Sequence, residues 1–177
     1  SDWDEAKWRQ AERVDAEAFD EKGRKPEAVI RRMFDRRMCR LHTASSGGGV
    51  YAMALSGEGD NADGVLVVDY FAVLASLRGR GEGRAFMAYI RDWAKAAGYR
   101  GIVVEVESDP TPDNVRRIRF WEACGFRPTA YVHHYIWVPE PYRAMYLNLD
   151  PERLLPDEGK TLFRYIERFH RKAYAKK

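Results

Sequence analysis

The chain has 177 residues, 45% of them apolar and 32% charged, which is enough to bury a substantial core in one domain over residues 1–177. A formal net charge of +3 is too small to indicate nucleic acid as a partner. No apolar run approaches the ~20 residues of a bilayer-spanning helix, and the acidic first residues are unlike a signal peptide, so we expect a cytoplasmic protein with no membrane partner.

Apolar spacing predicts two helices before any strand. The first extends over residues 4–19, and the second begins at Pro26, which suits the first turn of a helix. Alternating runs then predict strands, and the glycine-rich segments between them predict antiparallel hairpins. These runs are 38–43, 50–55 and 65–73.

A glycine loop follows the third run, and the pattern then becomes helical as far as Gly98. A strand is predicted over 102–106, and the next helix is expected to be capped by Asp113 or Asn114 and to end at Cys124-Gly125.

The last third of the chain predicts a hairpin and a helix. Two aromatic-rich runs, 131–138 and 142–149, are joined by a turn with two prolines. The final helix carries an apolar stripe that something must cover, and a homodimer is one way to cover it. The stripe consists of Leu162, Phe163, Ile166, Phe169 and Ala173.

The glycine loop has the properties of a phosphate-binding turn. Gly79, Gly81 and Gly83 carry no Cβ, and the first N–H groups of the next helix are free to bind an anion. Arg78, Arg80 and Arg84 add positive charge to the same turn.

Spacing excludes two common phosphate loops. A Walker loop needs Lys and then Ser or Thr after its last glycine, but Arg84-Ala85 stands here. A dinucleotide fingerprint needs a final glycine where Arg84 stands. The pattern that remains is Arg-x-x-Gly-x-Gly, formed by Arg78, Gly81 and Gly83.

This pattern resembles the coenzyme A loop of the GNAT superfamily of acyltransferases. The run 69–73 resembles the family's fourth strand, 102–106 resembles its fifth, and 114–126 resembles the helix that ends in Gly-Phe. The resemblance implies an α/β (α+β) fold with a mixed, mostly antiparallel central sheet flanked by helices, here with an added C-terminal helix.

The same resemblance implies acetyl-CoA, or another acyl-CoA, as cofactor, and transfer of the acetyl group to a primary amine of a small molecule or peptide by direct attack on the thioester. It assigns cofactor contacts to the fourth strand, the loop and the later helix. These residues are Phe71, Ala72, Val73, Arg78, Gly79, Arg80, Gly81, Glu82, Gly83, Arg84, Asn114, Arg117 and Trp121.

Such a reaction needs a base for the amine and an N–H donor for the oxyanion. Glu105 is the preferred base, because some family members carry a glutamate on the fifth strand. Asp69 is the alternative, since counting in twos from Phe71 places both on one face of the fourth strand. Glu107 ranks behind them. We expect the oxyanion donor in the segment 72–74.

The acid is where this chain departs from the family. Trp121 stands where many members have a tyrosine, and an indole N–H is not an ordinary proton donor. We therefore expect Trp121 to pack against the cofactor or the core. Tyr135 is a candidate to replace the missing acid, as are Tyr70 and Tyr131; alternatively, the thiolate leaves unassisted.

Metal and thiol chemistry are not expected. His133 and His134 point to opposite faces of a strand, and the two other histidines, His42 and His170, follow no pattern. Cys39 and Cys124 lack metal spacing and are expected to be inert thiols.

Two other functions stay open. Trp121 in place of the acid is compatible with a non-catalytic acyl-CoA sensor. The basic residues Arg116, Arg117 and Arg119, with the basic C-terminal helix, are compatible with an RNA-directed acyltransferase.

Overall fold

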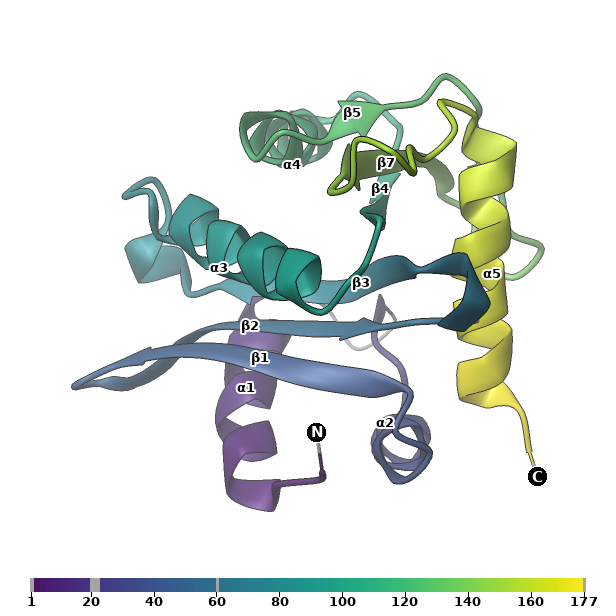
Figure 1. The fold of residues 1–177 in the computed structure, drawn as a ribbon. Coiled ribbons are helices and arrows are strands. Elements are labelled where there is room, and N and C mark those ends of the chain that lie inside the picture. Colours follow the sequence, from purple (N-terminus) through teal and green to yellow (C-terminus); the bar gives the residue numbers. More distant parts are fainter. Residues whose placement is uncertain (1, 20–22, 60, 177) are drawn as a thin grey trace.

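The computed structural model describes residues 2–19, 23–59 and 61–176, and Figure 1 shows how their helices and strands are arranged. The helices are α1 (Glu5–Ala18), α2 (Glu27–Asp35), α3 (Glu82–Ala96), α4 (Pro112–Ala123) and α5 (Gly159–Tyr174). The strands are β1 (Cys39–Ser46), β2 (Gly49–Gly57), β3 (Val65–Val73), β4 (Gly101–Glu107), β5 (Arg127–Pro128), β6 (His133–His134) and β7 (Pro141–Asn148).

All seven strands belong to one sheet, in the order β1-β2-β3-β4-β7-β5, with β6 also on β7. The pair β3–β4 is parallel and the other pairs are antiparallel. The parallel pair is joined by α3, as a parallel connection requires a crossover. The mixed, mostly antiparallel sheet and the C-terminal helix that the sequence predicted are confirmed.

Helices cover both faces of the sheet, and each face has its own core. One core contains the apolar sides of α1, α2 and α5, and the other contains those of α3 and α4. Figure 1 shows α3 on one side of β1–β3 and α1 and α2 on the other. The face that carries α1, α2 and α5 is called the α5 face below.

The apolar stripe of α5 is buried within the chain. Its five residues are each at most 1% exposed, and they join the core of the α5 face. Burial of large aliphatic and aromatic side chains stabilises a fold by about 1.5–3 kcal/mol each. The stripe therefore needs no second copy of the chain to cover it.

Local chemistry fixes the helix ends. Asp4 caps α1 by accepting the N–H of Lys7 at 3.0 Å. The predicted cap of α4 was wrong: Thr111 is the N-cap and accepts the N–H of Asn114. Pro112 explains the difference, because proline is favoured at the first helical position and starts the helix before Asp113.

The predicted final hairpin is only partly present. β7 spans most of the second run, but the first run contributes only the two residues of β6. The edge of β7 that faces away from β4 has two partners. β5 pairs with Tyr146 and Met145, and β6 pairs with Tyr142 and Pro141. Ile136 and Trp137 consequently lie outside the sheet and are exposed.

No helix among the described residues is both long and apolar enough to span a bilayer.

Candidate active site

The two strands at the centre of the sheet separate halfway along their length. β3 and β4 pair at Val65–Val67 with Gly101–Val103, and their residues beyond these points are not paired with each other. Figure 1 shows β4 leaving the plane of β3. Val68 and residues 70–73 remain paired with β2 on the opposite edge. The edge of β3 that faces β4 is therefore available to an extended ligand.

A bulge in β3 decides which side chains face which side. Tyr70 pairs with Leu55 and Val68 with Ser56, so Asp69 is the extra residue. The prediction that Asp69 and Phe71 lie on the same face of the strand was therefore wrong. Phe71 faces α3 and α4, whereas Asp69 faces the opposite side of the sheet.

Phe71 begins an aromatic cluster on the α3 side of the opening. Its ring lies 5.5, 5.4 and 5.2 Å from the rings of Phe86, Phe120 and Trp121. Trp121 is 8% exposed and also packs on Phe126, which confirms its place in the core. Ala72 and Val73 complete the strand and are buried.

The glycine loop leads directly into α3. Gly79 and Gly81 have φ angles of +76° and +81°, a region that L side chains rarely adopt, and a Cβ built on either would meet nothing within 4 Å. Gly81 is the N-cap of α3, and no side chain caps this end. The first N–H groups of α3 therefore remain free for an anion.

Charged side chains surround the loop in different ways. Arg80 and Arg84 are exposed. Arg78 folds back, and its Nε donates to the carbonyl oxygen of Val73 at 3.0 Å, which fixes the loop to the end of β3. Glu82 accepts the hydroxyl of Tyr51 at 3.3 Å.

Gly83 lies in the first turn of α3, next to the Phe120 ring of α4. A Cβ built on it would stand 3.0 Å from the Phe120 ring and 3.6 Å from Val73. A side chain here would enter the space between the loop and the aromatic cluster.

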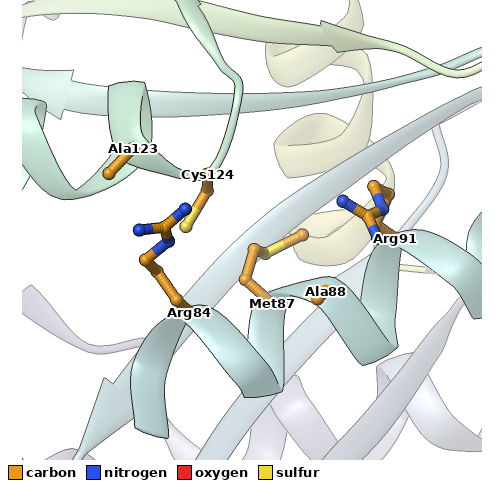
Figure 2. Close-up of a pocket in the computed structure, with 6 residues that line it drawn as sticks. All are labelled: Arg84, Met87, Ala88, Arg91, Ala123 and Cys124. Atoms are coloured by element: carbon orange, nitrogen blue, oxygen red, sulfur yellow. The ribbon is translucent and has the colours of Figure 1, made fainter. Parts of the chain in front are cut away.

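A small pocket lies between α3 and α4, beside the loop (Figure 2). It has a volume of about 100 Å³ and is lined by Arg84, Met87, Ala88, Arg91, Ala123 and Cys124. The guanidinium of Arg84 lies beside the Cys124 thiol. Burial raises the pKa of Cys124 to about 11, so this cysteine is a thiol rather than a thiolate at neutral pH. Cys39 is also a free thiol, and burial raises its pKa to about 12.

The residues of α4 that the sequence predicted to bind a ligand have partners within the protein. Asn114 is 4% exposed, and its Nδ2 donates to the carbonyl oxygen of Asp109 at 3.0 Å. The guanidinium of Arg117 lies 5.4 Å from the ring of Phe19, at the end of α1. Arg116 pairs with Asp113.

Glu105 lies on the α5 face, two residues beyond the last β4 residue paired with β3. The hydroxyl of Tyr135 donates to its Oε2 at 2.6 Å, and His170 Nε2 lies 3.1 Å from its Oε1. Its side chain is 24% exposed. Burial, together with the Glu105 charge, raises the pKa of Tyr135 well above its usual range, so Tyr135 stays a neutral donor.

A second pair of polar groups extends this cluster along α5. His133 Nε2 lies 3.0 Å from Glu167 Oε1, and its ring stacks on Phe163. Tyr131 reaches the other nitrogen of this ring at 3.1 Å. His134 is exposed, so the two adjacent histidines diverge as predicted. The described residues contain no group of three acidic, His or Cys side chains that could hold a metal.

Asp69 forms an ion pair with Lys25. Its Oδ2 lies 2.7 Å from Lys25 Nζ, and each of the two side chains is 6% exposed. Lys25 lies just before α2, and its side chain therefore reaches β3 beside the point where β3 and β4 separate.

Sequence comparison now places the chain among known proteins. The model of the acetyltransferase (GNAT) family matches residues 3–126, which is more than half of the chain. The chain belongs to the GNAT acetyltransferase family. It is therefore an acyltransferase, and its family uses acetyl-CoA. No curated protein matches the sequence of this GNAT acetyltransferase.

Solved structures share the fold. A GNAT-family protein from Bacteroides thetaiotaomicron is 21% identical, with 96% of this chain and 93% of that chain covered and a TM-score of 0.69. The ribosomal-protein-S18-alanine N-acetyltransferase of Escherichia coli is 18% identical, with 88% and 97% covered and a TM-score of 0.66. A Bacillus anthracis protein named for streptothricin acetylation, in complex with acetyl coenzyme A, is 20% identical, with 64% of each chain covered and a TM-score of 0.54.

The residues of this GNAT acetyltransferase fit an acyl-CoA. The uncapped start of α3 with exposed Arg80 and Arg84 suits a pyrophosphate, and the open edge of β3 suits an arm that carries amide groups. Every predicted cofactor residue lies on β3, on the loop or on α3 and α4 beside it.

Sequence reasoning missed the contributions of α5 and of Lys25. His170 and Glu105 are 65 positions apart, and only the fold brings them together. A weak signal exists on α5, because Glu167 and His170 are three residues apart and border its apolar stripe.

Proposed function

We propose that this chain is an acetyl-CoA-dependent N-acetyltransferase that acts on a primary amine of a small molecule or peptide. The observation that carries the proposal is the position of Glu105. It lies on β4 just past the point where β3 and β4 separate, and it faces the side of the sheet opposite the glycine loop's helix, α3. A donor and an acceptor can thus approach the opening from opposite sides of the sheet.

The donor side is formed by the loop, α3 and the free edge of β3. Free N–H groups of α3 and the side chains of Arg80 and Arg84 would hold the pyrophosphate. When bound, acetyl-CoA supplies a thioester, whose carbonyl carbon the amine attacks while the C–S bond breaks.

The contacts of the segment 72–74 favour one backbone N–H as the oxyanion donor. The N–H of Leu74 donates to the carbonyl oxygen of Tyr51 at 2.9 Å and is not available. Successive N–H groups of a strand point to opposite edges, so the N–H of Val73 points away from β2 and toward the opening. We assign Val73 as the oxyanion donor.

Glu105 accepts the proton of the amine. An aliphatic amine with a pKa near 10.4 is mostly protonated at neutral pH and must lose a proton before it attacks. Each carboxylate oxygen has two acceptor positions, so the bonds from Tyr135 and His170 leave room for the amine. These two residues position the carboxylate from both sides.

Tyr135 is thereby a positioning residue in this proposal rather than the missing acid. Its proton is directed at Glu105, and its raised pKa keeps that proton in place. The Trp121 ring packs against the rings of Phe71, Phe120 and Phe126, and an indole N–H is not an ordinary proton donor. The CoA thiol is a good leaving group and needs no acid of its own.

An amine acceptor agrees with the known relatives. The Escherichia coli structure with the same fold is an alanine N-acetyltransferase of a ribosomal protein. The acceptor side is the α5 face next to the opening between β3 and β4. Its acidic and aromatic side chains favour a cationic amine over an acid or a neutral alcohol; they include Glu105, Glu167, Tyr135 and Tyr142.

Thiol release from acetyl-CoA tests the proposal. Primary amines should accelerate release well above hydrolysis, and matched alcohols should not. Saturable acetyl-CoA binding with no amine-dependent release would instead identify a sensor.

A further inference from the structure

Lys25 places a primary amine inside the acceptor side of the site. Its side chain is 6% exposed, and Nζ lies 2.7 Å from the Asp69 carboxylate. Its backbone N–H also donates to the hydroxyl of Tyr70, which fixes the segment before α2 to β3.

Aromatic rings enclose this ammonium. Nζ lies 5.7 Å from the centre of the Tyr70 ring, 5.6 Å from that of Phe169 and 6.0 Å from that of Tyr174. A carboxylate with several aromatic faces is the kind of environment that recognises an alkylammonium ligand. Here the protein fills it with its own lysine.

The position of this lysine relative to the reaction centre follows from the sheet. Asp69 is the bulged residue of β3, two residues past Val67, and Glu105 is two residues past Val103, the partner of Val67. Phe169 contacts Lys25, and its neighbour His170 contacts Glu105. Lys25 therefore lies at the opening between the strands, where the proposed acceptor amine must react.

We propose that Lys25 is an acetyl acceptor within the same molecule, with an acetyl-CoA thioester as donor; this rests on the proposed function. Asp69 takes a proton from the ammonium, and the lone pair of Nζ attacks the thioester carbonyl carbon. An N–C bond forms and the C–S bond breaks, with its electron pair leaving on sulfur. The thiolate takes the second proton of the nitrogen, and Asp69 later releases its own to water.

Acetylation changes the charges of the site. The amide product carries no charge and cannot pair with Asp69, so a nearly buried carboxylate loses its cation. The modified protein should therefore unfold at a lower temperature than the unmodified protein, which gives a readout that is independent of turnover.

Peptide mass spectrometry after incubation with acetyl-CoA tests the proposal. Lys25 should gain one acetyl group faster than exposed lysines such as Lys95 and Lys160, although it is far less accessible. The rate should not depend on protein concentration, because the acceptor is intramolecular. Lys25→Arg keeps a cation for Asp69 and should abolish the fast phase, whereas Lys95→Arg should leave it unchanged.

Asp69→Asn and Gly83→Trp supply further controls. Asp69→Asn should slow Lys25 acetylation at least about tenfold, since the proton acceptor is lost. Equal acetylation of Lys25 in Gly83→Trp would reveal chemical acetylation without the site and would overturn the proposal. A rate that grows with protein concentration would also overturn it.

An external amine separates this inference from the proposed function. If the amine is acetylated while Lys25 stays unmodified, the Lys25 proposal is wrong and the acetyltransferase proposal stands. If neither is acetylated although acetyl-CoA binds, both proposals are wrong.

Discussion

Asp69 and Glu105 occupy equivalent positions on the two separating strands. Each lies two residues past the last parallel pair, Val67 and Val103, and both face the α5 side of the sheet. Their partners differ. Asp69 is held by a lysine ammonium, whereas Glu105 is held by a tyrosine hydroxyl and a histidine ring. This difference is why we assign proton removal from an external amine to Glu105.

Gly83→Trp should weaken acetyl-CoA binding at least about tenfold, which corresponds to about 1.4 kcal/mol. The new side chain would enter the space next to Phe120 and Val73, between the loop and the aromatic cluster. Calorimetric titration with acetyl-CoA measures the effect.

Gly98→Ala is the matched control for that change. Gly98 lies past the opposite end of α3, with φ +90°, and a Cβ added to it would meet nothing within 4 Å. The variant should lose about 1 kcal/mol of stability from backbone strain and keep its affinity for acetyl-CoA. Equal loss of affinity in both variants would mean that the loop does not bind the cofactor.

Tyr135→Phe should lower kcat about tenfold without changing the KM for acetyl-CoA, because Glu105 loses the donor that orients it. Tyr142→Phe removes a hydroxyl from the ring that packs edge-on to Tyr135 and should change kcat less than about twofold. Steady-state thiol release compares the two. Identical kinetics for Tyr135→Phe and the wild type would remove Tyr135 from the site.

Asp15→Asn should stabilise the protein in mild alkali. Burial raises the pKa of Asp15 to about 6 from 3.8, and Arg24 offsets this only in part. Its protonated form thus favours folding below pH 3.8, and this contribution is lost as the pH rises through 6. Asparagine does not ionise, so at pH 8 the variant should gain at most about 3 kcal/mol in urea unfolding. A gain that is the same at pH 4 and pH 8 would contradict this account.

His42→Gln should remove a contribution to the free energy of unfolding that is lost as the pH falls, which is the opposite of the Asp15 dependence. Burial, with Arg40 and Lys7 nearby, lowers the pKa of His42 to about 4 from 6.5, and Nε2 lies 2.8 Å from Ser56 Oγ. The neutral ring stabilises the fold above pH 6.5, and this contribution, at most about 3 kcal/mol, is lost as the pH falls through 4.

Glutamine can keep the bond to Ser56 but does not titrate. The advantage of the wild type over His42→Gln should therefore shrink between pH 7 and pH 4 in urea unfolding. Because Asp15 and His42 act in opposite directions over this interval, the wild type alone would conceal both effects. An advantage that does not change with pH would mean that His42 does not titrate with folding.

The sequence predicted the strand, glycine loop and helix of the proposed donor side, because their signals are local. Glycines with positive φ, the start of α3 and the run that forms β3 all lie within twenty residues. The apolar periods of α1, α3 and α5 likewise follow from side-chain spacing alone.

The acceptor side depends on features that have no local signal. A bulge at Asp69 reverses the face that alternation predicts, and only the register with β2 reveals it. Lys25 and His170 reach the opening from opposite ends of the chain. The length of β6 was overestimated, because competition between β5 and β6 for the edge of β7 is a property of the whole sheet.

Comparison of Glu105→Gln with Glu107→Gln tests whether Glu105 is the base that deprotonates the amine. The two residues lie on the same strand and undergo the same chemical change. With a primary amine near neutral pH, Glu105→Gln should lower kcat by about 10² or more and leave acetyl-CoA affinity unchanged, while Glu107→Gln should stay close to the wild type. Wild-type turnover in Glu105→Gln would contradict the assignment of Glu105 as the base.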